Sequence, residues 1–360
     1  MSARSVFLGD ICVHQPFSTA GSMEVDFLNS ADLVLANLEG AIGAASAEGN
    51  AKAMGVWNSV DVMPVLKALH VQAVWLANNH LYDLSQPVYH TTQALAAQGI
   101  ESFGAGANLE VAGRPFTFTQ AGTTIKAFAF GWDVIGCRFA RTDREGVNPL
   151  VPEHLLQTIR AVRKNDQRSF VVFIMHWNYE LELYPQPAQR QLAHDLIAEG
   201  VDAIVGLHPH VAQGAELVDG KPIIYSLGNW LFPPRQLGQF HLRFPAIAHR
   251  ELAVTVQNSG RNIEDVRFHW HRYDPESNQI SLEATEDWLG PILKSLTPFA
   301  GMPHAEYIRW FRQHRSRRKG LPIYANYRDN LGNAFKDRFV KARHSAINAL
   351  VALNLKRGLG

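Results

Sequence analysis

Short apolar runs that end in polar residues recur through the first two thirds of the chain, and apolar runs of this length are typical of buried strands. Five of these runs lead into Asp10, Glu39, Asn79, His176 and His208. Several segments between them carry apolar residues every three or four positions, which is the spacing of one helix face. This alternation predicts an α/β fold with buried, largely parallel strands.

The pattern changes along the chain. After about residue 115 the strand-like segments become denser, and two sheets stacked face to face with helices outside would accommodate them. Pro233 and Pro234 interrupt any regular element, so residues 233–249 are expected to be irregular. The expected strands cover residues 6–10, 33–40, 73–76, 100–103, 116–120, 124–130, 170–175, 203–205, 216–218, 223–226, 251–256 and 266–270. The expected helices cover residues 60–69, 88–98, 152–163, 187–199, 284–296, 305–313 and 330–355.

The polar residues at the strand ends are the main functional signal. Open α/β sheets build their ligand sites where strands emerge into loops. One histidine in such a place is usually a loop or core residue, but five polar strand ends together indicate a shared metal or catalytic site. Carboxylate, carboxamide and imidazole ligands suit manganese, iron, zinc or magnesium better than copper(I).

Composition narrows the class of protein. The chain has 360 residues, of which 46% are hydrophobic and 19% charged, so it can bury a large core. No apolar run approaches the roughly 20 residues that span a bilayer, and the N-terminal residues show no apolar signal segment. Cys12 and Cys137 give no disulfide framework. We therefore expect a cytoplasmic protein.

The charge is unevenly distributed. Residues 301–360 hold 13 Lys and Arg against 3 Asp and Glu, whereas the other 300 residues hold 21 against 30. A basic amphipathic helix in this tail could contact the inner face of an anionic membrane. It could equally dock on the acidic body of its own chain, or bind an anionic polymer or a protein. Nucleic acid is not expected, because neither aromatic-rich sheet motifs nor a basic body is present.

The order of motifs over residues 5–232 resembles the capsule-synthesis family, the CapA-type poly-γ-glutamate proteins. That family in turn resembles the calcineurin-like metallophosphoesterases. The resemblance implies a four-layer α-β-β-α sandwich over residues 4–283, followed by a helical, basic C-terminal extension over residues 284–360. The motifs that carry it are Gly9-Asp10, Asn37-Leu38-Glu39-Gly40, Ala77-Asn78-Asn79-His80 with Asp83, Gly104-Ala105-Gly106, His176-Trp177, Gly206-Leu207-His208-Pro209-His210 and Tyr225-Ser226-Leu227-Gly228-Asn229.

The resemblance also implies a cofactor and roles for single residues. Two divalent metal ions (manganese, iron, zinc or magnesium) are expected, with Glu39 as the bridging acid and Asn79 bound through its amide oxygen. His80 would be the acid that meets the leaving group, oriented by Asp83 through a hydrogen bond. The six implied metal ligands are Asp10, Glu39, Asn79, His176, His208 and His210.

The sequence departs from the phosphoesterase pattern near the first acid. The histidine that usually follows two positions later is Cys12 here, and His14 could replace it. Three further residues are candidates for substrate binding. Trp177 could line a substrate groove or cover the site, Glu180 could support the site or be a solvated loop acid, and Asn229 could touch substrate or tie a turn.

The sequence therefore predicts a metal-dependent, phosphoesterase-like hydrolase in the biosynthesis of a capsule or another anionic polymer, poly-γ-glutamate or polysaccharide. Its expected substrate is an anionic polymer or a phosphorylated compound. The same metal chemistry could cleave an amide, so the two reactions stay open at this point. The alternative is a non-catalytic assembly factor that binds metal or polymer beside a membrane-bound capsule synthase.

Overall fold

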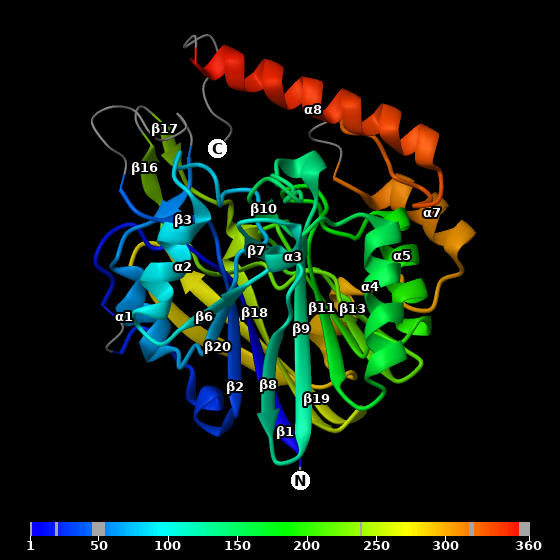
Figure 1. Cartoon of the computed structure of the whole chain (residues 1–360), viewed down its shortest axis with the longest axis horizontal. Helices are drawn as coiled ribbons and strands as arrows, with labels where there is room; N and C mark the ends of the chain where they lie inside the picture. Colours follow the sequence, from blue (N-terminus) through cyan, green and yellow to red (C-terminus); the bar gives the residue numbers. More distant parts are fainter. Residues whose placement is uncertain (1, 19–20, 45–54, 238–239, 317–319, 353–360) are drawn as a thin grey trace.

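Two β-sheets packed face to face form the centre of the molecule (Figure 1). The computed structural model describes residues 2–18, 21–44, 55–237, 240–316 and 320–352. The strands of the larger sheet are, in chain order, β1 (Ala3–Ile11), β2 (Leu33–Leu38), β5 (Ala73–Trp75), β6 (Glu101–Phe103), β15 (Asn229–Leu231), β18 (Arg250–Ser259), β19 (Asn262–Asp274) and β20 (Gln279–Glu286). Those of the smaller sheet are β8 (Phe116–Gln120), β9 (Thr123–Gly131), β11 (Phe170–His176), β12 (Ala203–Leu207), β13 (Ala215–Val218) and β14 (Lys221–Ile224).

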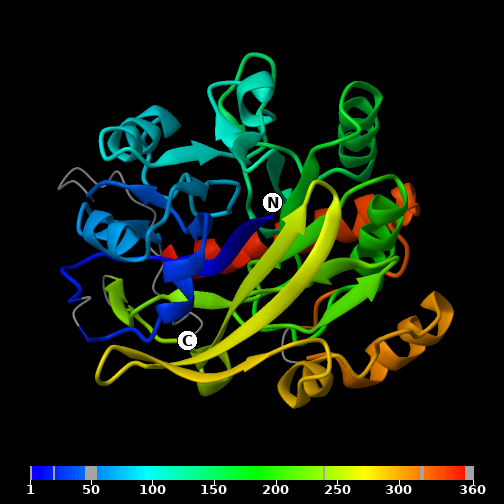
Figure 2. The same cartoon turned by 90° about the horizontal axis from the view of Figure 1, so that it is seen from below.

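The two sheets are mixed, and their parallel strands carry the polar strand ends. In the larger sheet the order is β20-β19-β18-β1-β2-β5-β6, and β15 pairs with the end of β1. β1, β2, β5 and β6 are parallel, whereas β18 and β19 run as a long antiparallel pair (yellow in Figure 2). In the smaller sheet the order is β13-β14-β12-β11-β9-β8.

Helices cover the outer faces of both sheets. Three of them begin with proline in the first turn, where the missing backbone N–H needs no partner. The α-helices are α1 (Val62–Ala68), α2 (Val88–Ala96), α3 (Leu109–Ala112), α4 (Pro152–Asn165), α5 (Pro187–Ala198), α6 (Pro291–Leu296), α7 (His304–His314) and α8 (Asn330–Ala352). Short elements complete the described chain: β3 (Ala41–Ile42), β4 (Trp57–Asn58), β7 (Ala105–Gly106), β10 (Gly146–Val147), β16 (Arg235–Leu237), β17 (Phe240–Leu242), and the 3-10 helices η1 (Asp26–Ser30), η2 (Asp133–Ile135) and η3 (Ala246–His249).

The central strands are apolar on both sides because each side faces a core. In β11 successive side chains point to opposite faces, so Phe170, Val172 and Ile174 lie in the core between the sheets. Val171, Phe173 and Met175 lie in the core beneath α4 and α5. α1 and α2 pack on the larger sheet. The resulting order of helix, sheet, sheet and helix confirms the predicted α-β-β-α sandwich.

Two predicted elements were wrong. The segment expected as a helix from residue 284 continues β20 to Glu286, and α6 begins only at Pro291. Pairing with β19 along its length holds these residues extended, so tertiary contacts outweigh their helix-like pattern. The expected domain boundary between residues 283 and 284 therefore falls inside a strand. The segment expected to be irregular contains the β16–β17 hairpin and η3.

The beginning of the predicted extension packs into the body. Phe299, Tyr307 and Phe311 belong to the same core as α4 and α5. A buried ion pair strengthens this junction: Arg190 Nε and Nη2 each donate to the carboxylate of Glu216 at 2.6 Å. Arg190 Nη1 also donates to the Met302 carbonyl oxygen, and the Gly301 N–H donates to Glu216.

Glu216→Gln should destabilise the fold by about 3 kcal/mol, because it leaves the Arg190 guanidinium buried and unpaired. Burial alone would raise the pKa of Glu216, but hydrogen bonds from Arg190, His194 and Tyr225 lower it to about 2. The stabilisation of the fold by ionised Glu216 is therefore complete above the ordinary pKa of about 4.5, and it is lost as the pH falls toward 2. Urea unfolding at several pH values measures it. The control, Glu199→Gln, breaks an exposed pair with Arg160 and should change stability by less than about 1 kcal/mol.

α8 (red in Figure 1) lies across the end of the molecule and is tied to the loop after β9, where Lys341 Nζ contacts Asp133 Oδ2 at 2.5 Å. Three apolar side chains at four-residue spacing are exposed on it: Leu331 (88%), Phe335 (75%) and Phe339 (50%). Contact of this helix with a membrane surface stays a prediction. Among the helices of the described residues, none combines the length and the hydrophobicity that a membrane span requires.

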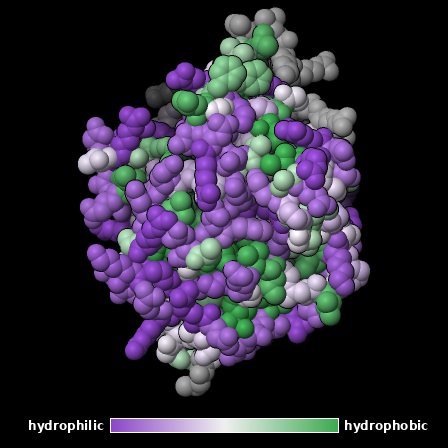
Figure 3. All heavy atoms as spheres, turned by 90° about the vertical axis from the view of Figure 1, so that its right-hand side faces the viewer, coloured by the Kyte–Doolittle hydropathy of each residue, from purple (hydrophilic) through white to green (hydrophobic). Residues whose placement is uncertain are grey.

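The rest of the predicted basic tail can be placed only in part. Residues 317–319 of the basic cluster and residues 353–355 of the predicted helix lie outside the described residues. The face seen in Figure 3 is mostly hydrophilic, with hydrophobic areas between polar side chains, the broadest of them in the lower half of the view.

Candidate metal centre

The first acid of the site lies at the end of β1. Asp10 is completely buried, and its strand pairs with β15 so that Asp10 stands opposite Asn229. The preceding Gly9 permits this approach, because a Cβ there would lie 2.3 Å from the Gly228 carbonyl oxygen. The close contact of β1 and β15 therefore fixes where the Asp10 carboxylate points.

Asn37 joins the two acids. Its Nδ2 donates to Asp10 Oδ1 at 2.7 Å and to Glu39 Oε2 at 2.5 Å. Glu39 follows β2 directly and is also completely buried. Burial, and then the charge of Asp10, raise the pKa of Glu39 to about 7. No role of its own was predicted for Asn37, although it begins the Asn37-Leu38-Glu39-Gly40 motif.

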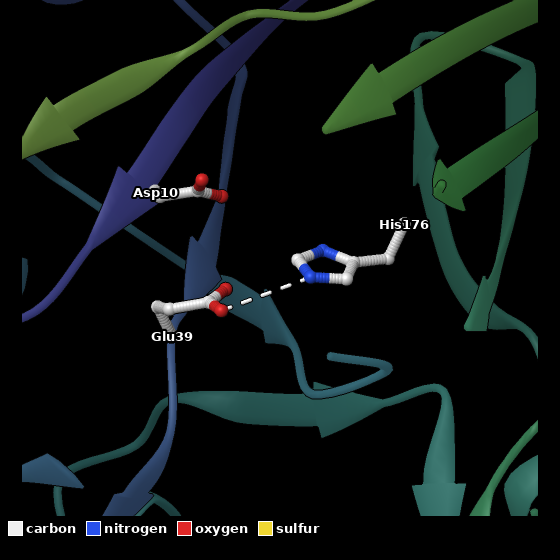
Figure 4. A group of neighbouring side chains, drawn as sticks. All are labelled: Asp10, Glu39 and His176. Carbon is white, nitrogen blue, oxygen red and sulfur yellow. Dashed lines mark ion pairs between the residues drawn. The ribbon is translucent and has the colours of Figure 1, made fainter. Parts of the chain in front are cut away.

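His176 approaches the acids from the opposite sheet (Figure 4). Its Nε2 lies 3.7 Å from Glu39 Oε1, and the ligand atoms of Asp10, Glu39 and His176 all lie within 4.8 Å of one another. Burial lowers the pKa of His176 to about 3, so its imidazole is neutral at pH 7 and can bind a cation. Three predicted ligands thus meet between the sheets.

Asn79 and His208 lie beside His176. Asn79 Oδ1 is 2.8 Å from His176 Nε2, and the rings of His176 and His208 have centroids 5.0 Å apart. His208 has a φ of 90° and His210 a φ of 57°, a left-handed backbone that is uncommon for residues with side chains. Strained backbone of this kind clusters at functional sites, where the surrounding structure enforces it.

His210 stands on the Asp10 side of the site. Its Nδ1 lies 2.9 Å from Asn229 Oδ1 and 3.1 Å from Asp10 Oδ2. Burial alone would lower the pKa of His210, but the hydrogen bond and charge of Asp10, with Glu39 and Glu180, raise it to about 9. Asn229 therefore orients His210, and Glu180 is close enough to act on it through its charge. Their predicted contact with substrate stays a prediction.

His80 and Asp83 form a hydrogen-bonded pair at the edge of the site. His80 Nδ1 donates to Asp83 Oδ2 at 2.5 Å, and the Val56 N–H donates to the same oxygen. His80 Nε2 faces the acids and lies 3.9 Å from Glu39 Oε1. Burial acts to lower the pKa of His80, but Asp83 and Glu39 outweigh it and raise the pKa above its usual value. The His80 side chain is 23% exposed.

Two residues are not brought to the centre. Trp177 is completely buried in the core beneath α5, and its Nε1 donates to the Tyr225 carbonyl oxygen at 3.0 Å. Its position does not support the predicted substrate contact, because it points to the far side of its sheet. Cys12 lies outside the group of Asp10, Glu39 and His176, and its Sγ is 3.4 Å from the Trp57 carbonyl oxygen.

Two more asparagines hold the loops that carry the site. Asn78 Nδ2 donates to the Leu38 carbonyl oxygen, and its Oδ1 accepts from the N–H groups of Gly40 and His80. Asn58 Nδ2 donates to the Glu39 carbonyl oxygen. Both are buried and neither was predicted. Asn78 stands in the Ala77-Asn78-Asn79-His80 motif, but no role was predicted for it.

The donor set fits divalent metal ions. Glu39 Oε1 and His176 Nδ1 are buried and receive no hydrogen bond from the described residues, and two carboxylates share one buried site. Buried like charges require a compensating cation or a shared proton. Carboxylate, amide and imidazole groups are ligands of manganese, iron, zinc and magnesium. The residues therefore match the cofactor class that the sequence implied.

Comparison with known proteins identifies the family. A family model described as bacterial capsule synthesis protein PGA_cap matches residues 5–234. The chain belongs to this family. It is 35% identical over 189 residues to the PGA biosynthesis protein CapA of Bacillus subtilis, covering 50% of this chain and 49% of that protein. It is 31% identical over 210 residues to a "Probable polyglutamine synthesis accessory protein" of Mycobacterium tuberculosis, covering 55% of each.

The chain thus spans about half the length of the curated relatives that it matches. Among solved structures, a 5'-nucleotidase precursor from Thermus thermophilus matches 87% of this chain and 60% of its own chain, with a TM-score of 0.44 and 12% identity. Similarity at this level of sequence identity and TM-score supports no conclusion about activity. Every CapA-family motif quoted from the sequence lies within the matched residues 5–234.

Proposed function

We propose that this capsule-synthesis family member is a metal-dependent hydrolase of phosphoesterase type that acts on an anionic polymer or a phosphorylated substrate in capsule biosynthesis. The observation that carries the proposal is the buried pair of Asp10 and Glu39 facing the neutral imidazole of His176. Burying two carboxylates beside polar atoms that lack hydrogen-bond partners costs free energy, and a purely structural role would not offset that cost.

The side chains would divide between two metal ions. Asn79, His176 and His208 lie together and would hold one ion. Asp10 and His210 lie together on the other side and would hold the second. Glu39, between the two groups, would contribute to both. Divalent ions in such a site supply Lewis acidity, which activates water and polarises a phosphoryl or carbonyl oxygen.

The chain's own residues would handle the protons and the orientation of the ligands. His80 would hold a proton on Nε2, which faces the centre, and give it to the departing oxygen. Asp83 accepts from Nδ1, which fixes the ring and favours the protonated form. Asn37 would keep the two acids at a fixed separation, and Asn229 would keep the His210 ring in place.

A non-catalytic role in polymer assembly is the second candidate. It is favoured by the name of the Mycobacterium tuberculosis relative, which is called an accessory protein of synthesis. In that role the same side chains would bind metal and a polymer end without turnover. The two candidates differ in one measurable property, which is the hydrolysis of a bond by the metal-loaded protein.

The test combines elemental analysis with assays of an aryl phosphodiester, an aryl phosphomonoester and a γ-glutamyl amide, each with manganese, iron, zinc or magnesium. Close to two metals per chain with phosphoester turnover is the expected result. Turnover of the amide alone would replace the phosphoesterase assignment with a peptidase one. Bound metal with no turnover of any of the three would support the assembly role, and failure to bind any metal would overturn the site.

A further inference from the structure

A buried arginine without a carboxylate partner lies next to the candidate metal centre. Arg235, the first residue of β16, is only 3% exposed. Within the described ranges no carboxylate oxygen lies within 4 Å of its guanidinium, and its Nε is buried without a hydrogen-bond partner. Arg163 and Arg190, the other arginines that are buried in the described part of the chain, each pair with a buried carboxylate. A buried charge of this kind is costly unless something compensates it.

The contacts that Arg235 does make place it against the site. Its Nη1 donates to the Trp57 carbonyl oxygen at 2.8 Å and to Cys12 Sγ at 3.5 Å. The guanidinium lies over the Trp57 ring, 4.5 Å from its centroid. Cys12 is two residues beyond the proposed metal ligand Asp10. In an extended chain the Cα atoms of these two residues lie about 7 Å apart. The guanidinium thus packs against a residue two positions beyond a proposed metal ligand.

His14 adds a second polar group on the same side. Its Nδ1 is also buried without a partner in the described chain. Burial, and then the charge of Arg235, lower the pKa of His14 to about 4, so His14 is neutral at pH 7. A neutral imidazole can donate one hydrogen bond, and a guanidinium can donate two in a fork that matches an oxyanion.

We propose that Arg235 and His14 bind an anionic oxygen group of the substrate, a carboxylate or a phosphate, next to the bond that is cleaved at the metal centre. The proposal rests on the proposed function and narrows its substrate class. A substrate with a second negative group close to the scissile bond would be favoured, and a neutral ester or amide would be a poor substrate. The ion pair with substrate would replace the carboxylate partner that Arg235 lacks.

The alternative is a structural role, in which Arg235 only fastens the β16–β17 hairpin to β4 through Trp57. The two roles predict different responses to anions. If Arg235 only fastens the hairpin, free phosphate or acetate should not affect it. If Arg235 binds substrate, binding of either anion should change the surroundings of its Nε–H group. Metal binding should be independent of Arg235 in both cases, because its guanidinium cannot act as a ligand.

The test uses the metal-loaded full chain. The Arg235 Nε–H signal, assigned by its loss in Arg235→Lys, is followed by NMR during titration with inorganic phosphate and, separately, with acetate at constant ionic strength. The expected result is a saturable shift with one of the two anions, which also identifies the preferred chemistry. The absence of a shift with both would overturn the proposal.

Affinity is then measured by calorimetry for two substitutions. Arg235→Met should weaken binding of the preferred anion about tenfold or more, and Arg235→Lys by less, because lysine keeps the charge but loses the fork. Arg243→Met, which removes an exposed arginine that follows β17 and pairs with Glu276, should bind like the wild type. Equal affinities for all variants would overturn the proposal. Metal content, measured alongside, reports separately on the proposed function.

Discussion

Glu39→Gln should bind metal at least about 100-fold more weakly than the wild type and lose about 10³-fold or more in turnover. Glu39 lies between the two groups of proposed ligands, and its Oε1 faces the nitrogens of His176 and His80. The substitution keeps the shape and the hydrogen-bonding capacity but removes the charge. A metal contributes several kcal/mol to the stabilisation of developing charge, and each 1.4 kcal/mol or so corresponds to a factor of ten in rate.

A matched control is available elsewhere in the chain. Glu251 is also completely buried, and burial raises the pKa of its carboxyl well above the ordinary value. Glutamine therefore resembles its protonated state, and Glu251→Gln should keep its metal and its turnover. If Glu39→Gln kept a full complement of metal and the activity of the wild type, Glu39 would have no place in the centre.

His80→Gln should reduce turnover by about 10²–10⁴-fold while leaving the metal content unchanged, because a well-placed general acid contributes this much. The effect should depend on the leaving group. A nitrophenolate departs without a proton, so the variant should lose least with a nitrophenyl ester and most with an alkyl ester. Asp83→Asn should show the same dependence with a smaller loss, because Asp83 would act on the reaction through the orientation and basicity of His80.

The control for His80 is His90→Gln, since His90 is exposed on α2 and faces solvent. Equal losses for all leaving groups would mean that His80 positions substrate or metal rather than donating a proton. Loss of metal from His80→Gln would make it a ligand instead. Either result would remove the proposed acid while leaving the assignment of the six ligands intact.

The layered arrangement of the sheets and the proximity of three candidate ligands could be predicted from the sequence for the same reason. Parallel strands buried on both sides must be apolar throughout, so their polar ends are conspicuous in the sequence. Asp10, Glu39 and His176 were found in this way, and the structure brings their ligand atoms within 4.8 Å of one another. Functional residues at the ends of such strands can be predicted because they are polar, whereas the residues of the strand before them are apolar.

Other features depend on contacts between distant residues and could not be predicted. The bond from Arg235 to Cys12 joins residues 223 positions apart, through a hairpin expected to be irregular. Asn37 lies within a strand, where its role in joining two acids shows only once Asp10 is beside it. Trp177 was placed near substrate because it follows His176, but successive residues at a strand end point to opposite sides.

The position of β1 in the larger sheet has a consequence for synthesis of the protein. One edge of β1 pairs with β2, which follows within 40 residues, but the other pairs with β18, where Ala3 stands opposite Asn258. At about 5–20 residues per second, the ribosome needs roughly 10–50 s to deliver that partner. During this interval the strand that carries Asp10 has an open, apolar edge. A nascent chain halted near residue 234, where the family match ends, would contain β15 but would keep the edge at residues 3–7 open and be prone to aggregation.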